Sequence, residues 1–206
     1  MDVYGQRYAM FISFDAVAVS GITVEALKIS QSLKQKGIKS YLDLGYDIKV
    51  DKGNFNKPYG HEHEIYNDVF TLTRINDITS VPHYSPEFIN KIHAVLIGEK
   101  LAVSPEEKSN IIKAADESSR ALAERIVHQW EKLQICIVIV ENGTLPENII
   151  YTRALYLAIE QYGRRHQLKN FVIWRDHDLM WNSEKNIMKY GLPPYHHAIK
   201  PVKSPF

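Results

Sequence analysis

The chain is poor in cysteine and has no long apolar run. Cys136 is its single cysteine, so an internal disulfide cannot form, as is usual for proteins of a reducing compartment. The longest apolar run covers residues 135–140, far short of the roughly 20 residues that cross a bilayer. Residues 1–7 are polar and lack the basic-then-apolar order of a secretory signal. These absences predict a soluble, cytoplasmic protein without a membrane span.

A surplus of charge of either sign is also absent. The 25 Lys and Arg residues balance the 24 Asp and Glu residues, and the net charge is +1. Because binding to a nucleic-acid backbone needs a basic footprint, this balance argues against a nucleic-acid partner. The 206 residues are 45% hydrophobic, an ordinary globular value, which predicts one or two domains with a sizeable core.

Several motifs of well-known catalytic sites are missing. GxGxxG and GxxxxGK[ST] do not occur, so a dinucleotide site and a P-loop have no sequence support. GxSxG is absent and Cys136 falls inside an apolar strand, which argues against a serine or cysteine hydrolase. His61 and His63 would share one face of an extended segment, but HExxH is absent and no third metal ligand is identifiable. The sequence therefore predicts no cofactor, and a metal-dependent enzyme is the weakest alternative.

Apolar patterning predicts strands that alternate with helices. Strands are expected at residues 8–14, 40–44, 69–73, 135–140 and 171–174, and helices from residues 22, 86, 105 and 147. Gly37 is expected to end the first helix, and Ser85 and Ser104, each followed by Pro, to begin the next two. The order β-α-β-β-α-α-β-α-β predicts an α/β fold, a doubly wound, Rossmann-like open parallel sheet with helices on both faces.

Ligands of such sheets bind outside the carboxyl ends of the strands, so the residues that follow strands are the candidate site. Ser20 and Gly21 end a loop of small residues before the first helix, whose free N–H groups favour anionic groups. A plain turn, with Gly21 allowing close packing, is the alternative. Glu141 and Asn142 follow the central strand and suit a hydroxyl-rich ligand, or they form a turn that caps the next helix.

The densest chemistry follows the last strand. Arg175, His177 and Asp178 stand there between two tryptophans, Trp174 and Trp181. Aromatic rings stack on sugars, and His and Asp side chains bind hydroxyls or move protons. A paired structural histidine is the alternative interpretation.

Residues 137–181 resemble the N-terminal domain of GT-B glycosyltransferases, in particular the group-one, family-four-like retaining enzymes. The matching segments are Glu141-Asn142, Leu145-Pro146-Glu147-Asn148, Arg153-Ala154-Leu155 and His177-Asp178-Leu179-Met180-Trp181. Ser20-Gly21 is similar to the glycine loop of that family, which normally carries two glycines. The resemblance implies that residues 1–198 form the acceptor-side half of a GT-B fold and that residues 199–206 approach the interdomain linker.

The resemblance further implies an acceptor-binding domain of an enzyme that moves a sugar from a nucleotide-sugar donor to a sugar or other hydroxyl acceptor. We do not expect the family's C-terminal donor domain within these 206 residues, so we expect the chain alone to turn over little. The C-terminal donor domain of the same protein is the partner that the resemblance implies. His177 is expected to contact a hydroxyl of the donor sugar, and Asp178 to orient it. The expected substrate-binding residues are Ser20, Gly21, Glu141, Asn142 and Arg175.

A non-catalytic Rossmann-like domain, which binds a small ligand or a partner chain in the same place, is the alternative from another class. A reading frame that continues past Phe206 into a second strand–helix domain would favour the transferase. A natural protein that stops there would favour the binding domain.

Overall fold

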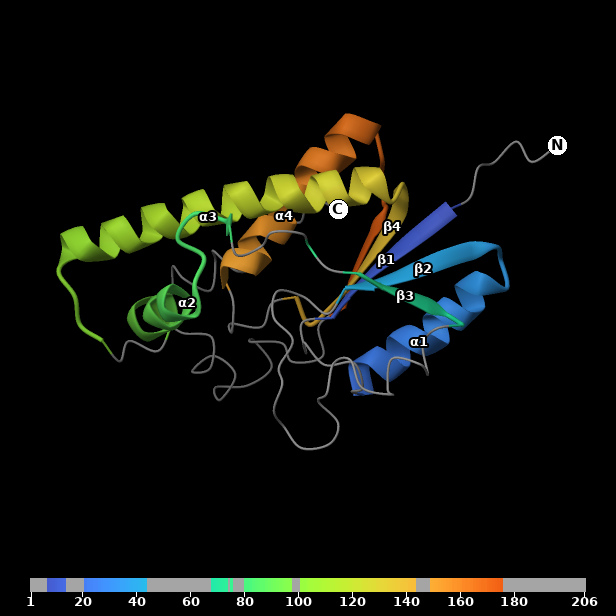
Figure 1. Ribbon diagram of the computed structural model, residues 1–206, viewed down its shortest axis with the longest axis horizontal. Coiled ribbons are helices and arrows are strands. Elements are labelled where there is room, and N and C mark those ends of the chain that lie inside the picture. Colours follow the sequence, from blue (N-terminus) through green and yellow to red (C-terminus); the bar gives the residue numbers. More distant parts are fainter. Residues whose placement is uncertain are drawn as a thin grey trace. The chain divides into compact units, whose positions relative to one another are not determined.

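The computed structural model describes residues 7–13, 21–43, 68–73, 75, 80–97, 101–143 and 149–175 (Figure 1). The chain divides into two compact units. Unit 1 contains Met1–Ile75, Gln129–Gly143 and Leu168–Arg175, and unit 2 contains Asn76–His128, Thr144–Gln167 and Asp176–Phe206. The expected linker at residues 199–206 lies outside the described residues. No helix in the described ranges combines the length and the apolar character that a membrane span requires.

Unit 1 is built on a five-stranded parallel sheet. Its strands are β1 (Arg7–Ser13), β2 (Ile38–Asp43), β3 (Phe70–Thr73), β4 (Ile135–Glu141) and β5 (Val172–Arg175). They lie in the order β3-β2-β1-β4-β5, and every neighbouring pair is parallel (Figure 1). The chain therefore adds strands on one side of β1 and then on the other. The predicted α/β fold with an open, Rossmann-like parallel sheet is confirmed.

Helix α1 (Gly21–Lys34) packs on one face of this sheet (Figure 1). A buried cluster joins the helix to four strands and consists of Ala9, Phe11, Ala26, Leu42, Phe70 and Ile139. The rings of Phe11 and Phe70 meet edge to face, with centroids 5.2 Å apart. Met10 and Ile12 point to the opposite face and are equally buried, as expected for the central strand of a parallel sheet. Gly37, with a φ of 77°, ends the turn after α1 as predicted.

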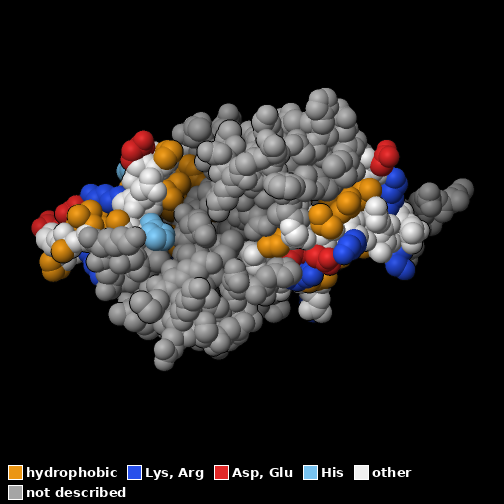
Figure 2. Space-filling view, turned by 90° about the horizontal axis from the view of Figure 1, so that it is seen from below, with side chains coloured by type: hydrophobic (Ala, Val, Ile, Leu, Met, Phe, Trp, Pro, Cys, Tyr) orange, Lys and Arg blue, Asp and Glu red, His pale blue; other side chains and the backbone are white. Residues whose placement is uncertain are grey.

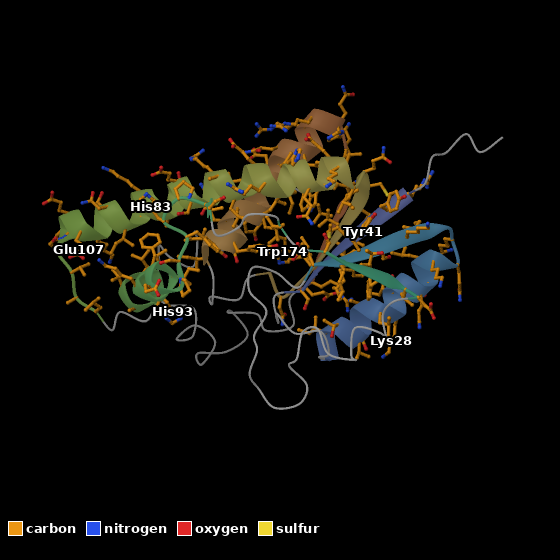
Figure 3. The ribbon with its side chains drawn as sticks, in the orientation of Figure 1. Lys28, Tyr41, His83, His93, Glu107 and Trp174 are labelled. Carbon is orange, nitrogen blue, oxygen red and sulfur yellow. The ribbon has the colours of Figure 1, made fainter. Side chains whose placement is uncertain are left out.

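Two tyrosines, Tyr8 and Tyr41, lie close together on the side of the sheet away from α1. Tyr41 is labelled in Figure 3. The ring centroids of Tyr8 and Tyr41 are 5.5 Å apart. Burial, and secondly the phenol of Tyr8, raises the pKa of Tyr41 above its usual value of 10.0. Because the pKa is higher in the folded state, the protonated phenol contributes stability that is fully present below pH 10.0 and is lost as the pH rises through the folded-state pKa.

We expect Tyr41→Phe to reduce the loss of stability that the protein shows above about pH 10. The reason is that phenylalanine keeps the ring packing and has no proton to lose. Urea unfolding followed at several pH values between about 8 and 11 measures this effect. A variant whose stability falls as steeply as that of the wild type would contradict the assignment to Tyr41.

Unit 2 is helical in its described residues. It contains α2 (Pro86–Ile92), a π-helical turn η3 (His93–Ile97), most of α3 (Pro105–Lys132) and α4 (Ile149–His166). The two predicted caps are confirmed, because the hydroxyls of Ser85 and Ser104 each accept a bond of 3.1 Å from the backbone N–H three residues later. The turn η3 is not anticipated by the sequence. The predicted start of the last helix, residue 147, lies outside the described residues, and α4 runs from Ile149 to His166.

Side-chain bonds tie the helices of unit 2 to one another. Asp116 of α3 pairs with Arg120 at 2.8 Å and with Arg153 of α4 at 3.5 Å. Lys91 of α2 pairs with Glu107 of α3 at 2.8 Å. All these groups are partly exposed, so they fix orientation more than they add stability.

Candidate functional site

The carboxyl ends of the strands meet at one edge of the sheet in unit 1. Ser13 ends β1, Glu141 ends β4 and Arg175 ends β5, and they are register partners, Ser13 with Glu141 and Glu141 with Arg175. Since side chains alternate along a strand, these three share the face of Phe11 and Ile139, which is the α1 face. The strand order reverses between β1 and β4, and open α/β sheets bind ligands at that point.

Glu141 and Arg175 form an ion pair at this edge. Nη1 of Arg175 donates to Oε1 of Glu141 at 2.9 Å, and the Glu141 side chain is fully buried. A carboxylate that is shielded from solvent needs such a partner. The desolvation of an isolated buried charge costs roughly several kcal/mol, even after the surrounding protein has relaxed. The Arg175 side chain is 31% exposed, and the bond to Glu141 requires one of the five N–H groups of its guanidinium. Arg175 can therefore hold Glu141 and still donate to a ligand.

Ser13 brings a hydroxyl to the same place. The residue is fully buried, and its Oγ has no hydrogen-bond partner within the part of the chain that the structure describes. Leaving a buried hydroxyl unsatisfied costs about 1–3 kcal/mol. A hydroxyl without a hydrogen-bond partner, at the point where the strand order reverses, can bind a ligand or an ordered water. The sequence does not single out Ser13, because its apolar pattern predicts a strand that continues through residue 14.

The chain leaves β4 through a tightly packed turn. Asn142 has a left-handed φ of 54°, and its backbone N–H donates to the carbonyl of Arg175 at 2.8 Å. Asn adopts this conformation more readily than most residues. Gly143 is buried, and a Cβ there would lie 2.3 Å from Cζ2 of Trp174 and 2.6 Å from Cγ1 of Val140. Trp174, labelled in Figure 3, thus packs on the turn that carries Asn142.

Gly21 begins α1. In a β-α-β unit the helix runs antiparallel to its strands, so its N-terminus lies at the carboxyl edge, on the face of Ser13 (Figure 1). A Cβ at Gly21 would meet nothing within 4 Å among the described residues, so the interpretation that Gly21 serves close packing finds no support. Its backbone N–H belongs to the first turn of the helix, which favours negative charge.

The predicted site is only partly within the described residues. Ser20, His177 and Asp178 lie outside them, and so do His61 and His63 of the metal alternative. No group of three or more potential metal ligands occurs in the described ranges.

The described members of the predicted site do gather at one edge. Glu141 and Arg175 are bonded to each other, Asn142 follows directly, and Gly21 opens the helix on the same face. Neither the models of known protein families nor the curated protein sequences contain a match to this chain. A function is therefore inferred from these residues and from their geometry.

Proposed function

We propose that this chain is the acceptor-side domain of a GT-B-type glycosyltransferase, which binds sugar hydroxyls at the carboxyl edge of the unit 1 sheet. The observation that carries the proposal is the row of Ser13, Glu141 and Arg175, in register on the face that α1 covers. The sequence resemblance over residues 137–181 and the order of the parallel strands support it.

The chemistry of the row suits hydroxyls. A sugar hydroxyl both donates and accepts hydrogen bonds. The hydroxyl of Ser13 can do the same, the guanidinium of Arg175 donates, and the carboxylate of Glu141 accepts. A phosphate group accepts only and would be repelled by the Glu141 carboxylate. Phosphates of a nucleotide-sugar would instead suit the N-terminus of α1 at Gly21.

His177 and Asp178 complete the proposal from the sequence alone. They follow Arg175 by two and three residues. In this proposal the imidazole of His177 binds a hydroxyl of the donor sugar, and the carboxylate of Asp178 orients that imidazole. Sugar transfer would then need a donor domain opposite this edge, so the chain alone is expected to bind ligands and to turn over little.

Asn142→Gly tests the binding role of the Asn142 side chain. Glycine keeps the left-handed backbone and removes the amide, so the unfolding free energy should change by less than about 1 kcal/mol while ligand binding weakens about tenfold. Saturation-transfer NMR with a panel of nucleotide-sugars and free sugars identifies the ligand and measures its affinity. Asn142→Ala is the matched variant that also strains the backbone, and it should lose both binding and stability. Unchanged affinity in Asn142→Gly would remove the side chain from the site.

The catalytic assignment has its own test. His177→Ala is made in the protein together with whatever its gene encodes beyond Phe206. Transfer of radiolabelled sugar should fall by about two orders of magnitude, the usual range for a positioned proton-transfer or hydroxyl-binding group. Full transfer by the variant would exclude His177 from the reaction.

A non-catalytic binding domain is the second candidate, and one observation favours it. Within the described residues, the acid at the strand reversal is Glu141, which is fully buried and bonded to Arg175. Such a carboxylate holds a ligand or a strand end and is poorly placed to exchange protons. Binding of a small ligand without transfer activity in the longer protein would establish this candidate.

A further inference from the structure

The opposite, amino-terminal edge of the unit 1 sheet carries a cluster of basic side chains. All its members are exposed and stand at strand starts or in the segments that lead into them. They are Arg7, Lys34, Lys36, Lys39, Lys132 and Lys169. The amino ends of parallel strands lie at one edge, and the register pairs Arg7 with Ile38 and Tyr8 with Ile135, so three strands start at the same level. We call these six residues the basic edge.

Carboxylates are few at this edge. Among the described residues of unit 1, Asp68 and Glu131 are the two acids near strand starts or helix ends there. Nζ of Lys34 donates a hydrogen bond to the backbone carbonyl of Asp68. Lys36, Lys39 and Lys169 make no ion pair with any described residue. Figure 2 shows Lys and Arg side chains at the right-hand end, where β1 and β2 begin in Figure 1.

Helix dipoles account for part of the basic edge only. Lys34 and Lys132 stand in the last turns of α1 and α3, where a cation is favourable. Lys39 lies inside β2, and Lys169 precedes β5. No helix C-terminus explains the charge at Lys39. Lys169 follows His166, the last residue of α4, by three residues and stands beyond the last turn, where the helix dipole acts most strongly. Exposed lysines that have no ion-pair partner among the described residues, at one edge of a chain with a net charge of +1, favour an anionic partner.

We propose that the basic edge docks unit 1 onto an anionic phospholipid surface. Five of the six cations are lysines, compact charges that suit a diffuse field, whereas recognition of single phosphates or bases favours the fork of arginine. The residues lie along strand starts and turns, and the chain as a whole has a pI near 7.8, below the range typical of nucleic-acid-binding domains. Lipid binding here leaves the carboxyl edge, with Ser13 and Glu141, directed away from the bilayer.

Vesicle sedimentation tests this proposal. The full chain is mixed with phosphatidylcholine vesicles that contain about one third phosphatidylserine, and with vesicles of phosphatidylcholine alone, at about 0.1 M salt. We expect binding to the anionic vesicles only, with release at about 0.5 M salt. Changing Lys36, Lys39 and Lys169 to Glu should weaken binding at least about a hundredfold, since each lost lysine costs about fivefold near such a surface and each new carboxylate adds repulsion.

The matched control carries the same charge change elsewhere. Lys28, Lys108 and Lys113 are changed to Glu, and vesicle binding should stay within about threefold. Circular dichroism confirms that both variants fold. Equal binding to both kinds of vesicle, no binding to either, or an equal loss in both variants would overturn the proposal. Displacement from vesicles by duplex DNA at equal phosphate concentration would also overturn it, in favour of a nucleic-acid partner. Sugar binding at the carboxyl edge is measured separately, so the two proposals can fail independently.

Discussion

Replacing Arg175 with methionine should lower the unfolding free energy by about 3 kcal/mol. The substitution roughly keeps the length of the side chain and removes the cation that is bonded to Glu141, whose side chain is fully buried. A buried carboxylate that loses a bonded cation is among the most costly defects that a single substitution can create. Urea denaturation followed by circular dichroism measures the change.

A second substitution distinguishes this cause from lost packing. In the pair Glu141→Gln with Arg175→Met no charge remains buried, so the double variant should regain most of the lost stability. Lys28→Met is the control, because Lys28 and Glu25 are bonded at 2.7 Å on the surface of α1, with side chains 65% and 45% exposed. That change should cost less than about 0.5 kcal/mol. Equal, small effects at Arg175 and Lys28 would show that the Glu141 pair is not desolvated.

The fold of unit 1 could be predicted because its signals are local. The spacing of Ala26, Ile29 and Leu33 marks one face of a helix, and in the structure all three pack on the sheet. Gly37 and the cap serines act through their own backbone neighbourhood, so their roles follow from a few residues. The order of helices and strands then leads to a parallel sheet through the handedness of β-α-β connections.

The site could be predicted less completely because it depends on register. Glu141 and Arg175 were both expected to bind a ligand, but their bond joins residues 34 positions apart and exists only because β4 and β5 pair in one register. Ser13 becomes an unpartnered hydroxyl only once the end of β1 and its burial are known. The turn η3 leaves no periodic signal, because one π-helical turn of five residues is shorter than the window in which periodicity is read.

The role of Gly143 also depends on partners that are distant in the chain, so the sequence around it does not indicate that role. A glycine after a strand normally indicates a flexible turn, but here the side of the backbone that a Cβ would occupy is filled by Trp174 of β5, 31 residues later in the chain. The packing connects the turn after β4 to the end of β5. Asn142 follows β4 and Arg175 ends β5, so the chain leaves the sheet at these two residues, on either side of the candidate site. Their positions therefore depend on the packing of Trp174 against Gly143.

Gly143→Ala is expected to destabilise the protein by about 1–3 kcal/mol, since the new methyl group would overlap the indole of Trp174 and the side chain of Val140. Urea unfolding measures the loss, and a shift of the tryptophan emission to longer wavelength reports displacement of the ring.

Gly21→Ala is the control for this prediction. A Cβ at Gly21 meets nothing among the described residues, so alanine in the first turn of α1 should leave stability unchanged or raise it by up to about 1 kcal/mol. Adding Trp174→Leu to Gly143→Ala makes room for the methyl group, so the two substitutions together should cost less than the sum of their separate effects. Strictly additive costs would mean that Gly143 and Trp174 do not press on one another, and the turn would then lose its role in holding the two exits from the sheet together.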